Sequence, residues 1–467
     1  MKKLIALLVA LCLSVGLCAC SESEKNEPHK DESQNADATA FQGTAIKGYT
    51  CSDGKVYIPT PDGEIITVQK HEPDYQVYAA WLTPDEKHIV SIQSNHLVCS
   101  DFSQNKSIDL GLSNHIFTVQ NKGVLYIDEN EHLCLYSFDQ EKKISHEGMT
   151  PPAGRVIVAE RTLSCGFADD DTVYVWPHDE TDPIEIGYYP KAQVHWISND
   201  GETLIWTGEG DALFMYQDET VVTLTTRAES SYGLETTDGK LCIINDTSKN
   251  GCLYIQRPGK EMHCIDIETY SGWTNFYTSA GPLNQSKANE ADTIYALSDS
   301  TLYAIDKNNK THIISKGITQ FSIYGNRLVY QEGSRLFFAT LEDNKIKNPV
   351  QAAIDVDSYQ TNDNQTIYYV KRVNRNGHLY EIDFDNKQPQ FINNLESMVD
   401  LGFVYELNPY TGWLFCIEDQ EWDDTLTKTL SKIRGYNGPE QSIHLENIYD
   451  YTVVDNLPWH SYMNLNW

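Results

Sequence analysis

The feature that most constrains the fold is a unit of about 40 residues that recurs from residue 45 to the end of the chain. Each copy has a short apolar strand, a turn rich in Asp, Asn and Gly, and a strand with an aliphatic–Tyr pair. A hairpin then leads to a strand of the type Leu-Tyr-x-x-Asp. One such unit cannot bury its apolar face alone, so neighbouring copies are expected to stack on one another.

Ten copies can be aligned on their turns, and the two weaker ones lie at 168–176 and 401–416. The others begin at 51–58, 81–90, 118–126, 196–206, 236–244, 292–296, 323–330 and 361–369. Adjacent turns from Asp53 to Pro409 are about 40 residues apart on average. Four short strands and their turns need about 40–45 residues, which is the size of one β-propeller blade.

The local chemistry of the copies predicts strands. Asp-Gly pairs supply the positive φ of tight hairpin turns, and Val, Ile, Tyr and Leu alternate with polar residues. Helical repeats of similar length need a 3.6-residue period, which is missing. One helical alternative is the spacing of Trp422, Leu426, Leu430 and Ile433. The segment 429–445 also fits a strand, a turn and a return strand, and the repeat context favours the strands.

Two copies carry a family resemblance. WLTPDEKHIV at 81–90 and WISNDGETLIW at 196–206 resemble the Trp-Ser-Pro-Asp-Gly-Lys-x-Ile signature of propeller repeats in the periplasmic Tol-system protein. Similar repeats form the propellers of prolyl-oligopeptidase-type peptidases. The matching positions, which we take as a structural repeat signature, are Trp81, Asp85, Trp196, Asp200 and Gly201.

The resemblance implies an all-β fold, a β-propeller of four-stranded blades over residues 45–467. Only Trp81 and Trp196 carry the aromatic residue at its signature place, and the spacing of the copies varies. Ten units would make an unusually large single ring, so we expect some weak copies to be loops or pieces of neighbouring blades and favour one closed ring of seven or eight blades. Two smaller rings or a larger single ring are the alternatives.

The N-terminal residues predict a signal peptide and a lipid anchor. Lys2 and Lys3 precede an apolar run over residues 4–17, which is too short to span a bilayer and suits a signal peptide. The run ends Leu-Cys-Ala-Cys, which resembles the lipobox of bacterial lipoproteins. The resemblance implies removal of residues 1–19 as a signal peptide and lipidation of Cys20. The alternative is an ordinary secretory signal, in which Cys20 is incidental.

Residues 21–40 contain almost no bulky apolar side chains, so residues 20–44 are expected to form a lipidated, disordered linker. The protein would then be held in the cell envelope, on the extracytoplasmic side of a membrane. That membrane is the plasma membrane in a one-membrane host, or the outer membrane in a two-membrane host.

The chain is strongly acidic, with 35 Lys and Arg against 67 Asp and Glu and a net charge of −32. Without residues 1–19, which hold two lysines and no acids, the net charge becomes −34. Such a surface repels phosphate backbones, so no nucleic-acid partner is expected. The 28 tyrosines, against 14 Phe and 9 Trp, favour strands.

Motifs for catalysis are missing. The sequence has no Gly-x-Ser-x-Gly, no His-Glu-x-x-His and no mature Cys-x-x-Cys, so no catalytic residue, metal or cofactor is predicted. The acids at 169–171 and the pair Asp383 and Asp385 are interpreted as solvated turns, and residues 208–210 as a hairpin turn. His195 and His460, each beside a Trp, could line a site, but a strand position is the favoured interpretation.

Eight cysteines follow Cys20, and most sit at apolar strand positions typical of small buried side chains. They are Cys51, Cys99, Cys134, Cys165, Cys242, Cys252, Cys264 and Cys416. Cys242 and Cys252 flank one hairpin and form the best candidate disulfide, because the expected compartment permits disulfides.

Two functions from different classes remain open. A rigid repeat platform without a catalytic signature favours a non-catalytic binding or scaffolding module for an envelope protein, peptide or glycan. The alternative is a glycan-active hydrolase or lyase that uses carboxylates near the propeller channel. The ligand is expected at one end of the ring, where loops between blades converge.

Overall fold

A computed structural model describes residues between 46 and 448, with gaps in several connecting segments. Residues 1–45 and 449–467 lie outside the described residues, so Cys20, the linker and His460 do as well. The chain divides into two compact units, Met1–Ala40 and Phe41–Trp467, and all described residues belong to the second. No helix among them is long and apolar enough to cross a membrane.

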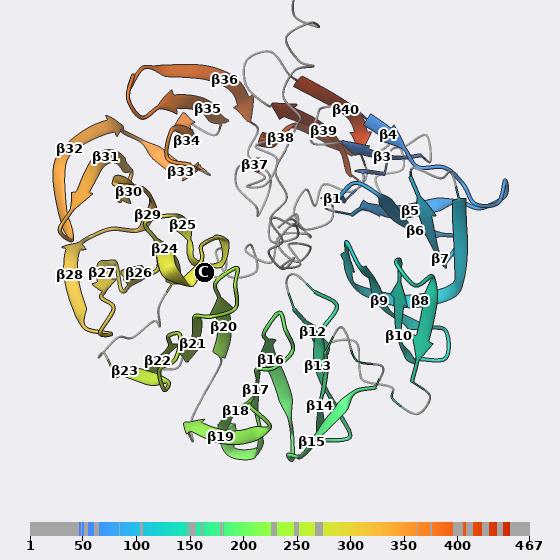
Figure 1. The fold of residues 1–467 in the computed structure, drawn as a ribbon. Coiled ribbons are helices and arrows are strands. Elements are labelled where there is room, and N and C mark those ends of the chain that lie inside the picture. The colour runs from blue at the N-terminus through green and yellow to red at the C-terminus, as the bar shows by residue number, and fades with distance from the viewer. Residues whose placement is uncertain are drawn as a thin grey trace, which may run out of the picture. The chain divides into compact units, whose positions relative to one another are not determined.

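The described residues form antiparallel sheets that follow one another in chain order (Figure 1). The first is a three-stranded sheet of β2 (Tyr49–Thr50), β3 (Val56–Pro59) and β4 (Ile65–Thr67). The next four units have four strands each and use β8 twice, because its two halves pair with different neighbours. The strands are β5 (Val77–Leu82), β6 (His88–Gln93), β7 (His96–Asp101), β8 (Lys106–Gln120), β9 (Gly123–Asp128), β10 (Leu133–Ser137), β11 (Lys142–Ser145), β12 (Val156–Val158), β13 (Cys165–Asp169), β14 (Thr172–Trp176), β15 (Ile184–Tyr188), β16 (Gln193–Ile197), β17 (Leu204–Thr207), β18 (Leu213–Gln217) and β19 (Thr220–Thr225).

Five more four-stranded units complete the described part of the chain. Their strands are β20 (Ser231–Glu235), β21 (Cys242–Asp246), β22 (Cys252–Gln256), β23 (His263–Asp266), β24 (Thr274–Thr278), β26 (Ile294–Ser298), β27 (Thr301–Ile305), β28 (Thr311–Lys316), β29 (Gln320–Tyr324), β30 (Arg327–Glu332), β31 (Arg335–Glu342), β32 (Lys345–Ala353), β33 (Val356–Gln360), β34 (Thr366–Val373), β35 (Asn376–Asp383), β36 (Pro389–Leu395), β37 (Tyr405–Leu407), β38 (Leu414–Trp422), β39 (Thr429–Tyr436) and β40 (Ser442–Ile448). Two short strands add to sheet edges: β1 (Ile46–Lys47) pairs with β5, and β25 (Gly281–Pro282) pairs with β24.

The prediction of repeated four-stranded antiparallel sheets is therefore confirmed. Each of the ten sequence copies falls in a different unit, nine of them four-stranded and one three-stranded within the described residues. The expectation that only seven or eight of these copies form a unit was wrong. The weak copy at 168–176 forms the β13–β14 hairpin, and the copy at 401–416 contains β37 and the start of β38. Both keep the strand alternation although they lack the signature aromatic residue.

The segment 429–445, which was open to a helical interpretation, contains β39 and the start of β40, two antiparallel strands. The strand prediction is confirmed, and the sequence Asn-Gly-Pro at 437–439 is itself unfavourable for a continuous helix.

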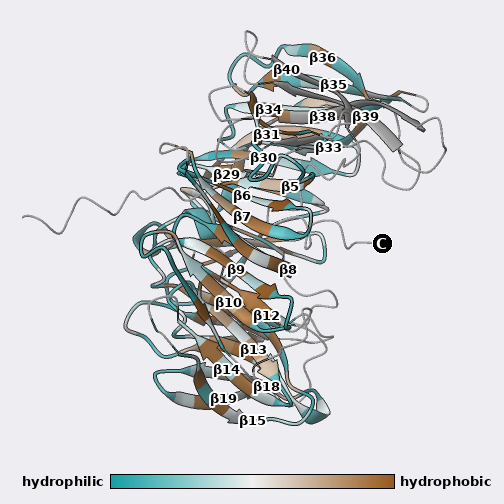
Figure 2. Cartoon of the chain, turned by 90° about the vertical axis from the view of Figure 1, so that its right-hand side faces the viewer, coloured by the Kyte–Doolittle hydropathy of each residue, from teal (hydrophilic) through white to brown (hydrophobic). Residues whose placement is uncertain are grey.

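The core lies between neighbouring sheets rather than inside any one of them. One apolar cluster joins Trp196 and Met215, from the unit β16–β19, to Ile244 and Tyr254 of the following unit. Another joins Leu302 of the unit β24–β28 to Leu328 of the next. In Figure 2, apolar residues lie along the strands and polar residues along the turns. Consecutive sheets thus bury apolar residues against one another, as the repeat predicted.

Polar contacts reinforce this packing. Arg257, which is buried, donates hydrogen bonds to Ala291 O (2.7 Å), Asp306 O (3.0 Å) and Asn309 Oδ1 (2.8 Å) of the following unit. A planar guanidinium can reach three acceptors at once, which an ammonium on a flexible stem does less well. The turn after β22 is therefore fixed to two turns of the next sheet.

Candidate functional site

The signature aspartates act inside turns. Thr83 Oγ1 donates a 2.7 Å hydrogen bond to Asp85 Oδ1, and Ser198 Oγ donates a 2.5 Å bond to Asp200 Oδ1. The backbone N–H two residues after each aspartate also points at the same oxygen, that of Glu202 at 2.9 Å. Gly201 adopts φ +79°, which its lack of a Cβ permits. These residues close the hairpin between the first and second strands of their sheets.

The signature tryptophans pack between sheets. Trp196 is only 9% exposed and lies directly over Gly233 of the next sheet, where a Cβ would come 2.2 Å from the indole. Trp81 is half-buried against the apolar cluster of the unit that follows it. Both tryptophans thus contact the apolar clusters between sheets, and their interpretation as packing residues rather than ligand platforms stays a prediction.

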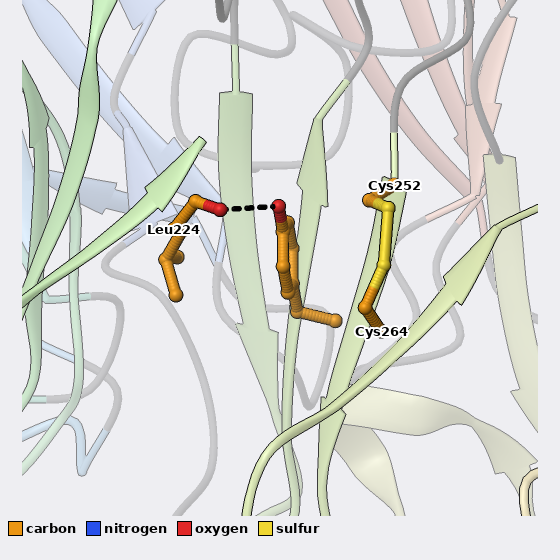
Figure 3. The surroundings of a disulfide bond; sticks show 4 residues. Leu224, Cys252 and Cys264 are labelled. Atoms are coloured by element: carbon orange, nitrogen blue, oxygen red, sulfur yellow. Dashed lines mark hydrogen bonds between the residues drawn. A yellow bond between two sulfur atoms is a disulfide. The ribbon is translucent and has the colours of Figure 1, made fainter. Parts of the chain in front are cut away.

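The candidate Cys242–Cys252 disulfide was wrong, because Cys252 is bonded to Cys264 instead (Figure 3). Cys242 is a free, buried thiol. In the β21–β22 ladder Cys242 lies opposite Gln256, four residues from Cys252, which corresponds to about 13 Å along the strand. Cys264 in β23 lies opposite Tyr254, two residues from Cys252, and the two Cα atoms are 6.0 Å apart.

The other residues singled out from the sequence have structural places. Asp170 and Asp171 form the β13–β14 turn with positive φ, and residues 208–210 lie in the β17–β18 turn. His195 lies at an irregularity in the β16–β17 ladder, and its Nε2 is 2.8 Å from Thr207 Oγ1. Burial lowers the pKa of His195 below its ordinary value. Cys51 and His460 lie outside the described residues.

The structure brings together one polar and aromatic group that the sequence did not reveal. We call it the Tyr75 cluster, made of His71, Tyr75, His96, Ser107 and Asp109. Tyr75 OH donates a 3.2 Å hydrogen bond to Asp109 Oδ2, and His96 Nδ1 lies 2.9 Å from the same oxygen. His71 Nδ1 lies 2.7 Å from Ser107 Oγ. The Tyr75 ring centroid is 5.0 Å from that of His96 and 6.4 Å from that of His71.

One connection and two strands build this cluster. His71 and Tyr75 belong to the connection between β4 and β5, while the remaining members belong to β7 and β8. The connection is fixed over the end of the sheet because Gln93 Nε2 donates to Gln69 O (3.1 Å) and Ser94 N donates to Gln76 O (2.8 Å). The rings are therefore held as a row at the end of the sheet where β6 turns into β7.

The electrostatic environment of the cluster is negative. Burial alone would raise the pKa of Asp109, but hydrogen bonds from Gly111 N–H and His96 outweigh it and lower this pKa below its ordinary value. Asp109 is thus an acceptor-only carboxylate, and His96 Nδ1 carries the proton between them. Desolvation raises the pKa of Tyr75, and the charges of Asp109, Glu72 and Asp74 raise it further.

This arrangement can hold a ligand against three neighbouring rings, which are tilted by 42° and 37° relative to one another. Because each imidazole is oriented through Nδ1, each is left with Nε2 for a hydrogen bond to a partner. No sequence motif could have predicted the cluster, because its members are up to 38 residues apart. They meet only because the connection between β4 and β5 packs on the neighbouring sheet.

Carboxylates elsewhere serve mainly as turn acceptors. The N–H groups of Lys310 and Asn386 lower the pKa values of Asp306 and Asp383 respectively. Among the described carboxyls, burial raises the pKa of Glu381, with a further contribution from Asp383. In the described part of the chain no group of three or more His, Cys, Asp or Glu is placed to hold a metal ion.

Comparisons with known proteins do not assign a family: no family model and no curated protein matches the chain. Solved structures that match include a eukaryotic initiation factor, with 9% identity over 87% of this chain and 98% of that chain and a TM-score of 0.49. Dipeptidyl peptidase 4 of Porphyromonas gingivalis matches with 10% identity, 81% and 60% coverage and a TM-score of 0.43.

The tricorn protease matches with 11% identity, 87% coverage of this chain, 46% of that chain and a TM-score of 0.31. The chain therefore spans less than two thirds of the length of both peptidases. These similarities, all with TM-scores below 0.5, do not indicate a function for this chain.

Proposed function

We propose that the chain is a lipid-anchored extracytoplasmic lipoprotein whose sheets form a β-propeller, and that it binds a ligand without catalysis. The observation that carries the binding role is the Tyr75 cluster, a row of oriented rings held over the end of one sheet. The stacked sheets supply the rigid support that positions such a surface.

The anchor rests on the N-terminal sequence. Lipidation at Cys20 would hold the sheets near a membrane without a spanning helix, and the Cys252–Cys264 disulfide fits an oxidising compartment. Full-length chain expressed in bacteria is expected to enter the detergent phase on phase partitioning. Cys20→Ala should move it to the aqueous phase, whereas Cys18→Ala, the matched control, should not. Detergent partitioning of the Cys20→Ala chain equal to the unchanged chain would contradict the anchor.

Closure of the propeller is part of the proposal. The three-stranded unit β2–β4 packs on the unit that begins with β5, through Val56 and Ile58 against Val77 and Leu82. In a closed ring, the other face of this three-stranded unit would pack against β37–β40, the last unit described. Packing of these two terminal units would close the ring and leave no sheet face of the series uncovered.

The ligand is proposed to carry positive charge. The negative charges of Glu72, Asp74 and Asp109 raise the pKa of the Tyr75 hydroxyl, and no cation contributes to this shift. A cation over an aromatic face is attracted by the ring, and nearby carboxylates strengthen the attraction. The overall charge of −32 also steers cations towards the chain. A lysine or arginine side chain of a peptide or protein fits this chemistry.

A titration with an oligolysine peptide at physiological salt tests the binding role. The unchanged chain should bind, and Tyr75→Ala combined with His96→Ala should weaken binding about tenfold, which corresponds to about 1.4 kcal/mol. Tyr188→Ala is the matched control, because Tyr188 is exposed on β15 outside the cluster. Equal binding by all three chains would mean that only the net charge attracts the peptide, and absence of binding would also contradict the proposal.

One observation keeps the glycan hydrolase as a second candidate. The raised pKa of Glu381 beside the lowered pKa of Asp383 is the kind of separation that an acid and a base need. The Asp383 oxygens, however, already accept bonds from Asp385 N–H, Asn386 N–H and Gln365. Release of reducing ends from envelope glycans by the unchanged chain, lost in Glu381→Gln, would favour this second function.

A further inference from the structure

The Cys252–Cys264 disulfide ties the outermost strand of its sheet to the strand before it. β23 has four residues, pairs with β22 alone among the described strands, and is the last strand of the unit. Cys252 lies opposite Asp266 and Cys264 lies opposite Tyr254, so the two cysteines are two register positions apart on one face of the sheet. Figure 3 shows the bond crossing between these neighbouring strands.

This disulfide differs from the other described cysteines in its access to solvent. Cys264 is exposed and Cys252 is half-buried. Cys99, Cys134, Cys165, Cys242 and Cys416 are free thiols, and all five are buried. Burial raises the pKa values of the Cys99 and Cys165 thiols, which keeps them protonated and unreactive. An external thiol can therefore reach the bonded pair before any of the five others.

The disulfide also lies beside a contact between two sheets. Tyr254, opposite Cys264, donates a 3.0 Å hydrogen bond from its hydroxyl to Leu224 O of the preceding unit (dashed line in Figure 3). Cys252 and Leu224 both pack on the apolar cluster that joins these two units. The disulfide thus restrains the outer edge of its sheet near the place where this sheet contacts the preceding unit β16–β19.

We propose that Cys252–Cys264 is a thiol-exchange site, through which a dithiol reductant reversibly frees β23 without unfolding the chain. A thiolate of the dithiol attacks the exposed Cys264 sulfur, and Cys252 leaves as a thiolate that takes up a proton. The second thiol of the reductant then attacks the reductant's own sulfur in the mixed disulfide, which releases Cys264. The reductant becomes a disulfide, and two electrons and two protons pass to the two cysteines.

The consequence should be local. The ladder between β22 and β23 and the Tyr254–Leu224 hydrogen bond do not depend on the sulfur–sulfur bond. Reduction removes the covalent restraint on a four-residue edge strand, whose isolated ladder is weak. Amide hydrogen exchange in β23 should therefore become faster, while exchange in the buried strand β21 should stay unchanged.

Differential alkylation of the full chain tests the site. The folded chain is incubated with dithiothreitol, alkylated, unfolded, reduced and alkylated again with a heavier reagent, and peptide mapping reports each cysteine separately. Cys252 and Cys264 should take the first label at least tenfold faster than the five buried cysteines. A Cys252→Ala chain, with no disulfide to open, serves as the control and should label at Cys264 without reductant.

Two results would overturn the proposal. In one, Cys252 and Cys264 take the first label only after a denaturant is added, so that the bond is closed to thiols in the folded state. In the other, they take it at the same rate as the five buried cysteines, so that reduction requires global unfolding. The unchanged chain decides both outcomes, even if the control variant folds poorly.

Discussion

The backbone N–H of Asn199 donates a 2.6 Å hydrogen bond to Glu235 Oε1, a side chain that lies 36 residues further along the chain in the next sheet. The amide of Asp85 makes the same kind of bond, at 2.8 Å, to Asn121 Oδ1, again 36 residues away. Each bond runs from the first turn of one sheet to the neighbouring sheet. The repeat length seen in the sequence is thus also the sequence distance between residues that hold neighbouring sheets together.

The Asn199–Glu235 bond should contribute measurably to stability. Glu235 is only 8% exposed, so Glu235→Ala leaves the Asn199 amide without this acceptor and should lower the free energy of unfolding by about 1–3 kcal/mol. Glu235→Gln keeps an acceptor oxygen and should lose less than half of that. Urea denaturation of the three chains measures the difference, and equal losses in Ala and Gln would show that charge rather than this bond matters.

The packing of Trp196 over Gly233 predicts a strong effect of a single methyl group. A Cβ at position 233 would come 2.2 Å from the indole, so Gly233→Ala should destabilise the chain by about 1–3 kcal/mol. Adding Trp196→Leu should relieve the clash, so the double variant should be more stable than the sum of the single losses predicts. Thermal unfolding in a double-mutant cycle checks this, and strict additivity would mean that the two residues do not contact.

Much of the fold could be predicted because its information is local and repeated. Asp-Gly turns, alternating strands and a 40-residue period located all ten units, including the weak copies. The number of sheets was underestimated because ten units would make an unusually large ring, so weak copies such as those at 168–176 and 401–416 were expected to be loops or pieces of neighbouring blades. The signature aromatic residue is present in only two copies, at Trp81 and Trp196. Packing does not need that aromatic residue: Phe167 and Trp176 of the weak unit are fully buried without it.

The candidate site was less accessible to sequence reasoning. The Cys252–Cys264 pair depends on the register between β22 and β23, and a shift of one residue would move one cysteine to the other face. The Tyr75 cluster depends on where the β4–β5 connection crosses the sheet, which no local pattern specifies. Contacts between side chains that are distant in the sequence, and that meet because of where a loop lies, can be identified only from the three-dimensional structure.

Burial of His195 predicts a pH dependence of stability. Its pKa in the folded chain is lowered, so the unfolded chain binds the proton more tightly below pH of about 6.5. The stability that neutral His195 contributes is complete above that pH and is lost as the pH falls towards its folded pKa. His195→Gln should therefore reduce the drop in urea midpoint between pH 7.5 and pH 5. An unchanged drop would show that His195 does not titrate in this way.

The most direct test of the account is whether the first and last units meet, because the repeats form a β-propeller only if the series closes. A short amine-reactive cross-linker, followed by mass spectrometry, can join Lys55 beside β3 to Lys432 in β39. Lys260 and Lys307, whose neighbouring sheets touch through a 3.3 Å hydrogen bond, provide the positive control. A closed ring predicts both cross-links within single chains. The control cross-link without any link between residues 55 and 432 would contradict closure.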